Sequence, residues 1–134
     1  MSISKEEKSM GMQEFVKKWN GVSVEDDGCF MSGEAKQFVT QFRNALKKDL
    51  PDAEITIKPG HYDLYGFVSE NGHTVYVSYN IPRYGLPVNC SDCGVNGILY
   101  RTARDTKDFT GGPNHFCGFR ELPGNLRRML EVQS

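Results

Sequence analysis

An Asn71-Gly72 dipeptide between two strand-like runs is the feature that most narrows the folds open to this chain. The runs, Tyr62 to Ser69 and His73 to Tyr79, are rich in aromatic and β-branched side chains, which favour strands. Asn and Gly both tolerate the positive φ angles of a type I′ turn. The sequence therefore predicts a β-hairpin, and a sheet that is antiparallel at this point.

Two helical patterns precede the hairpin. The first follows a possible capping box at Ser4 and Glu7 and ends at Asn20-Gly21, and the second follows Ser32, a favourable N-cap, and stops before Pro51. Apolar residues recur at helical spacing in both. In the first they are Met12, Phe15, Val16 and Trp19, and in the second Ala35, Phe38, Val39, Phe42, Ala45 and Leu46. We expect both helices to bury these stripes, with the single tryptophan in the core.

Further elements flank the hairpin. From Ala53 to Lys58 apolar and polar residues alternate, which predicts a strand with one solvated face, ended by Pro59-Gly60. A fourth strand is expected from Ile98 to Ala103. A last, short helix after Pro123-Gly124 would use Leu126, Met129 and Leu130.

These elements predict a single α+β domain over residues 1–134. Short links between consecutive strands favour a mostly antiparallel sheet of about four strands, with the second helix covering one face. The other face is then open. Four tyrosines become candidates for an aromatic surface on it, although cross-strand packing is the more common role of such residues. They are Tyr62, Tyr65, Tyr76 and Tyr79.

Charge and composition exclude some functions. The 16 Lys and Arg nearly cancel the 17 Asp and Glu, so the overall charge gives no reason to expect binding to nucleic acid or to an anionic membrane. The N-terminus is charged and lacks the apolar region of a signal peptide, and no stretch reaches membrane-spanning length. We therefore expect a cytoplasmic protein, whose four cysteines remain reduced.

The cysteine pattern predicts a divided zinc site. Cys90 and Cys93 are two residues apart in a turn-like stretch, and His115 and Cys117 alternate around Phe116. In an extended segment His115 and Cys117 would point the same way, as two ligands of one ion must. Four such ligands form a closed tetrahedron, which is typical of structural zinc. The expected ligands are thus Cys90, Cys93, His115 and Cys117.

Alternatives to this ligand set stay open. Cys29, next to Gly28, competes with His115 for the fourth position. The cysteines can also be small buried hydrophobes or form one or two disulfides. Zinc is preferred because of the spacing and the reducing compartment.

An enzyme is not expected. His61 and Asp63 ahead of the cysteine pair imitate the order of zinc-dependent deaminases, but Asp63 is one methylene shorter than the glutamate that shuttles the proton. Two other functions stay as alternatives to a binding protein. One is a zinc-bearing nucleic-acid-binding module, for which the C-terminal third has a basic tendency. The other is a small zinc hydrolase.

If the chain is a binding protein, a sequence resemblance indicates its partner. At residues 79–85, and again from Ile98 to Gly112, the sequence resembles small proteins on mobile elements of Gram-positive bacteria. Its size, near-neutral charge and cysteine-rich site are similar to those of zinc-containing type II anti-CRISPRs, which inhibit Cas9. The resemblance implies a stoichiometric inhibitor with a structural zinc, a partner that is Cas9 or another CRISPR effector protein, and no direct binding to nucleic acid.

Overall fold

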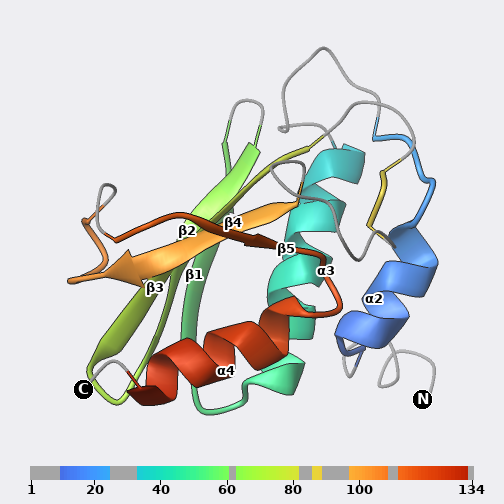
Figure 1. Ribbon diagram of the computed structural model, residues 1–134. Helices are drawn as coiled ribbons and strands as arrows, with labels where there is room; N and C mark the ends of the chain where they lie inside the picture. Colours follow the sequence, from blue (N-terminus) through green and yellow to red (C-terminus); the bar gives the residue numbers. More distant parts are fainter. Residues whose placement is uncertain are drawn as a thin grey trace.

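A computed structural model describes residues 10–24, 33–60, 63–81, 86–88, 97–108 and 112–132. Within them the fold is α+β, with a five-stranded sheet and three helices (Figure 1). The elements are α2 (Met12–Trp19), α3 (Gly33–Asp49), β1 (Glu54–Pro59), β2 (Asp63–Glu70), β3 (His73–Asn80), β4 (Ile98–Ala103), β5 (His115–Cys117) and α4 (Leu122–Val132). None of these helices has the length and apolar content needed to cross a bilayer.

The strands form an antiparallel meander in the order β1-β2-β3-β4-β5. At the hairpin between β2 and β3, Asn71 has a φ of 55° and Gly72 a φ of 82°, as a type I′ turn requires. The predicted hairpin is therefore confirmed. The expected count of about four strands is one short, because His115–Cys117 pairs with β4 as a fifth strand. Three residues are too few for a period of two to stand out in the sequence.

Carboxylate side chains cap the start of α2 and join it to α3. The Glu14 carboxylate accepts a hydrogen bond from the backbone N–H of Gly11 (3.1 Å), and the Asp49 carboxylate accepts one from Met12 N–H (3.0 Å). Asp49 is the last residue of α3, directly before Leu50-Pro51, so the expected stop at the proline is confirmed. The expected capping residues Ser4, Glu7 and Ser32 lie outside the described residues.

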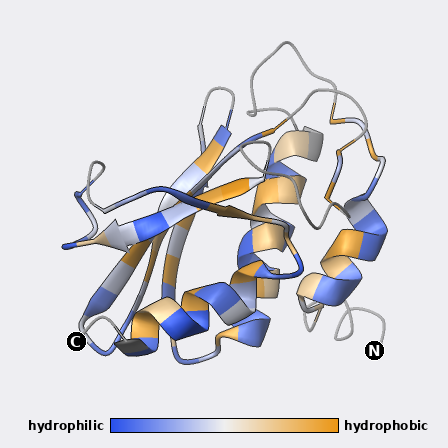
Figure 2. Cartoon of the chain, in the orientation of Figure 1, coloured by the Kyte–Doolittle hydropathy of each residue, from blue (hydrophilic) through white to orange (hydrophobic). Residues whose placement is uncertain are grey.

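One core lies between the sheet and all three helices. The inward residues of the strands, such as Val68, Val75 and Val77, belong to the same buried cluster as the apolar stripes of α2, α3 and α4. Figure 2 shows hydrophobic and hydrophilic residues alternating around α2 and α3, as expected for helices with one buried face. Trp19 is buried as expected.

Phe119, between β5 and α4, lies at the centre of an aromatic cluster in this core. Its ring centroid is 4.8 Å from Tyr79, 5.5 Å from Phe42 and 5.8 Å from Phe15, within the range of favourable aromatic pairs. These contacts join α2, α3 and β3 to the C-terminal part of the chain. They hold the turn before α4 against the core.

Helix α4 begins at Leu122, earlier than the sequence indicates. Pro123 and Gly124 were expected to precede the helix and instead lie in its first turn. A proline is tolerated there because the first N–H groups of a helix have no intrahelical partner. Leu122, Leu126 and Leu130 are buried against the sheet.

Candidate functional site

His115 and Cys117 lie on the helix-covered face of the edge strand β5. They are opposite Tyr100 and Ile98 of β4, which face the core, whereas Phe116 between them is exposed on the other face. The expected common direction of the two candidate metal ligands is therefore confirmed. His115 is exposed, and its ring stacks on Tyr100 with a centroid distance of 5.4 Å.

The Cys117 thiol is buried, and burial raises its pKa to about 11. A hydrogen bond from the Asn125 side chain on α4 offsets part of this shift, and the nearby Glu121 carboxylate adds to it. Such a thiol stays protonated at neutral pH and is a poor nucleophile, unless a metal ion replaces its proton. A thiol in this environment does not suit a catalytic nucleophile.

The remaining candidate ligands, Cys29, Cys90 and Cys93, lie outside the described residues. Within the described part of the chain no three His, Cys, Asp or Glu side chains gather as a metal site. Chain connectivity nevertheless permits the divided site. Cys93 precedes Gly97 by four residues, and the next residue, Ile98, pairs with Cys117. Four residues span at most ~14 Å, and this short link is compatible with ligands contributed from both segments.

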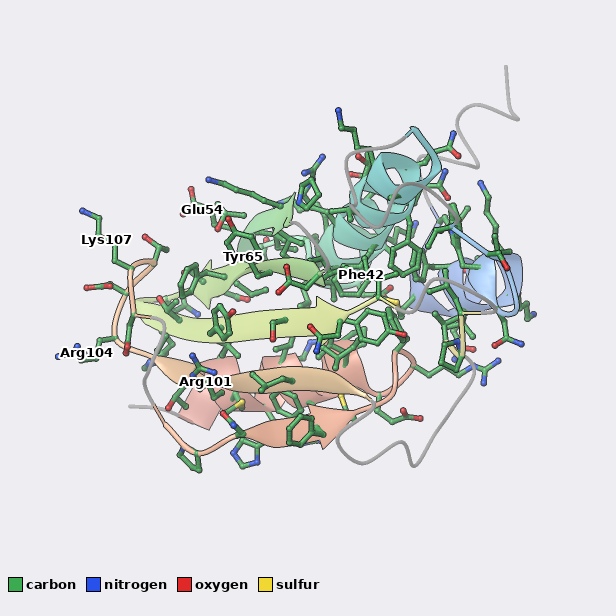
Figure 3. All side chains as sticks on the ribbon, turned by 90° about the horizontal axis from the view of Figure 1, so that it is seen from above. Phe42, Glu54, Tyr65, Arg101, Arg104 and Lys107 are labelled. Carbon is green, nitrogen blue, oxygen red and sulfur yellow. The ribbon has the colours of Figure 1, made fainter. Side chains whose placement is uncertain are left out.

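The sheet face opposite the helices forms the second candidate site. Figure 3 looks down on this face, with α4 behind the strands and with Tyr65 and Arg101 labelled on β2 and β4. None of the described helices covers it. We call it the open face and define it by the outward residues Glu54, Thr56, Lys58, Asp63, Tyr65, Phe67, Tyr76, Leu99, Arg101 and Phe116.

The centre of the open face is an ordered aromatic and arginine cluster. Phe67 and Tyr76 are register partners with ring centroids 5.4 Å apart, and the Arg101 guanidinium lies 4.3 Å from the Tyr76 centroid. Arg101 also donates a long hydrogen bond of 3.5 Å to Asn114. Burial raises the pKa of the Tyr76 phenol, although a hydrogen bond to Ser78 and the Arg101 charge each offset part of the shift. Phe67 and Arg101 are buried, at 5% and 8% exposed, and Tyr76 is half-buried, so the cluster is largely desolvated.

Charges on the open face nearly balance. The outward positions of β1, β2 and β4 carry Glu54, Lys58, Asp63 and Arg101, two of each sign. Arg104, after β4, forms an ion pair with Asp108 at 3.5 Å. This face does not form the continuous basic surface that nucleic-acid binding needs.

The expected aromatic surface is only partly confirmed. Tyr65 and Tyr76 lie on the open face, Tyr79 faces the core and is buried, and Tyr62 lies outside the described residues. Tyr79 lies two and four residues from Val77 and Val75, so it faces the same side of the strand as these core residues. The alternation of side chains along the strand therefore indicated that Tyr79 is buried.

Comparisons with protein-family models, curated proteins and solved structures found no match to this chain.

Sequence reasoning missed the pairing of Tyr76 with Arg101. In the sequence Arg101 is only one of several basic residues in the C-terminal third, because a cross-strand contact depends on the register between β3 and β4. The deaminase-like arrangement is not tested by the structure. Asp63 lies on the open face, whereas His61, Cys90 and Cys93, its other members, lie outside the described residues.

Proposed function

We propose that this chain is a binding protein that inhibits Cas9, docking on it through the open face. The observation that carries the docking part is Phe116, 36% exposed on the open face, together with the half-buried Tyr65 and Tyr76. Phe67 and Arg101 are buried and hold the Tyr76 ring in place. Aromatic residues are among the types that most often dominate the affinity of protein interfaces. Cas9 is the partner that the sequence resemblance indicates.

The cluster favours a protein partner over nucleic acid. Its side chains are already packed against one another, so little side-chain entropy would be lost on binding. The balanced charge of the open face removes the electrostatic attraction on which nucleic-acid affinity depends. Inhibition would then be stoichiometric, by obstructing DNA engagement or a domain movement of Cas9.

We propose further that one structural zinc ion stabilises the C-terminal half. Cys117 and His115 would hold it from β5, with Cys90 and Cys93 completing the tetrahedron, and Cys29 as the alternate ligand. When bound, the ion would cross-link distant segments and contribute to folding stability. This half also carries Phe116, so a loss of zinc would disturb the docking surface indirectly.

A binding and cleavage assay tests the inhibitor proposal. Purified protein is mixed with Cas9 and guide RNA, complex formation is followed by gel filtration, and DNA cleavage is titrated against inhibitor concentration. We expect a complex and a loss of cleavage that is complete near equimolar inhibitor. The absence of both association and inhibition would overturn the proposal. Strong, salt-sensitive retention on DNA would favour a nucleic-acid-binding module instead.

A matched pair of variants tests the docking surface. Tyr65→Ser removes a half-buried ring from the open face, whereas Lys36→Ser changes an exposed residue on α3. We expect only the first to weaken Cas9 binding, by about tenfold. Equal affinities for both variants would place the contact elsewhere.

A further inference from the structure

A small hollow opens at the edge of the sheet, away from the open face. Its volume is about 150 Å³, and it is lined by Tyr100, His115, Asn125, Arg128 and Met129. Two strands and a helix contribute, because Tyr100 lies on β4, His115 on β5 and the other three residues on α4. No acidic residue is among those that line it.

One side of the hollow is rich in hydrogen-bond donors. Asn125 is one of the lining residues and accepts a hydrogen bond from the Arg128 guanidinium. Burial raises the pKa values of the Tyr100 hydroxyl and the Cys117 thiol, and the Asn125 side chain lowers both, opposing the effect of burial. The hydrogen bond to Asn125 orients Arg128 across one turn of α4 and leaves its remaining N–H groups able to bind a ligand. A guanidinium held in this way recognises a planar carboxylate through two parallel hydrogen bonds.

The other side is flat and apolar. The stacked rings of Tyr100 and His115, with an interplanar angle of 30°, form one wall, and the thioether of Met129 contributes a second. A cavity of ~150 Å³ is large enough to bind a benzene ring. Aromatic rings and methionine sulfur both make favourable contacts with a bound ring.

We propose that this hollow binds a small aryl carboxylate. Its ring would lie between Met129 and the wall formed by Tyr100 and His115, and its carboxylate would bind Arg128. A volume of about 150 Å³ is suited to a ligand with a single ring. The proposal does not depend on the Cas9 interaction, because the hollow lies on the helix-covered side of the sheet. The zinc site proposed above, with three thiolates and His115, would carry a net charge of about −1 beside the hollow and would weaken the binding of an anion there.

Binding of benzoate tests the proposal. Backbone amide NMR shifts are followed during titration with benzoate, and benzamide and acetate serve as probes that lack the charge and the ring. We expect saturable benzoate binding with a Kd of about 1 mM or tighter and shifts centred on Tyr100, His115, Asn125 and Arg128. Benzamide and acetate should each bind at least about tenfold more weakly. Unsaturable benzoate shifts, or equal affinity for benzamide or acetate, would overturn it.

Two arginines on one helix supply the matched variants. Arg128→Gln should weaken benzoate binding about tenfold, because the guanidinium is lost. Arg127→Gln should bind benzoate as the unchanged protein does, since Arg127 lies outside the hollow and donates to the Asp49 carbonyl. Equal losses in the two variants would mean that only overall charge matters, and would contradict the site.

Discussion

The guanidinium carbon of Arg101 lies 4.3 Å from the ring centroid of Tyr76, on a sheet face that none of the described helices covers. The two residues are register partners on β3 and β4, so the antiparallel pairing of the strands brings them together. A cation over an aromatic face contributes ~0.5–2 kcal/mol, more as the pair is desolvated. Arg101 is 8% exposed, so this contact is largely desolvated and its stabilisation is expected toward the upper end of that range.

Phe116→Ser is expected to separate binding from stability. Phe116 is the large hydrophobic side chain that stands out as exposed in the described part of the chain, at 36%. Its loss should reduce Cas9 affinity about tenfold, or ~1.4 kcal/mol, while the free energy of unfolding falls by ~1 kcal/mol or less. Surface plasmon resonance and urea unfolding measure the two effects. Lys107→Ser, an exposed change after β4, is the control, and a loss of affinity in both variants would argue against the open face.

Gly66 and Gly124 should respond to alanine with opposite signs. A Cβ on Gly66 would lie 2.7 Å from the Cα of Ile57 and still closer to the Thr56 carbonyl, so the β1 backbone would have to move. We expect a loss of ~2 kcal/mol or more, as for overpacked sites. At Gly124, in α4, the nearest atom is the Arg128 guanidinium at 3.9 Å, and alanine should add ~0.5–1 kcal/mol through helix propensity. Urea denaturation of both variants checks the prediction, and a stable Gly66→Ala protein would contradict the close β1–β2 approach.

Tyr79→Phe is expected to keep or increase stability. The Tyr79 hydroxyl is buried and has no hydrogen-bond partner among the described residues, so its removal costs nothing at neutral pH and can add up to ~1 kcal/mol.

Tyr79→Phe should also reduce the loss of folding stability at alkaline pH. Burial raises the pKa of the Tyr79 phenol above its value in the unfolded chain. Its contribution to stability is therefore complete below the unfolded pKa of ~10 and is lost as the pH rises above it. The free energy of unfolding of Tyr79→Phe and of the unchanged protein is measured near pH ~7 and pH ~11, on either side of that pKa. An equally steep loss in Tyr79→Phe would show that other groups account for it.

Metal analysis is expected to find about one zinc ion per chain in protein purified without added metal. Cys90→Ser and Cys117→Ser should each abolish it and lower the Tm by ~10 °C or more, since a structural zinc contributes directly to folding. Cys29→Ser is the matched control and should change neither quantity if His115 is the fourth ligand. Zinc-free protein with unaltered melting in both ligand variants would end the zinc proposal.

Local patterns were sufficient to predict most of the elements. The Asn71-Gly72 turn, the alternation in β1 and the apolar stripes of α2 and α3 depend on steric and solvation preferences that act over a few residues. β5 and the start of α4 were not predicted, because three residues carry too little periodicity and Pro123 with Gly124 resembles a boundary. For the same local reason, the shared direction of His115 and Cys117 was predictable.

By itself the sequence determined the α+β class, the hairpin, the helical stripes and the two-residue alternation that turns His115 and Cys117 to one side. Only the tertiary structure decided that Tyr76 meets Arg101, that Tyr79 turns into the core, and that Arg128 joins Tyr100 and His115 around a hollow. Those contacts join residues far apart in the chain, and they depend on strand register and on helix docking. Both are set by the burial of one shared core and not by any short stretch of sequence.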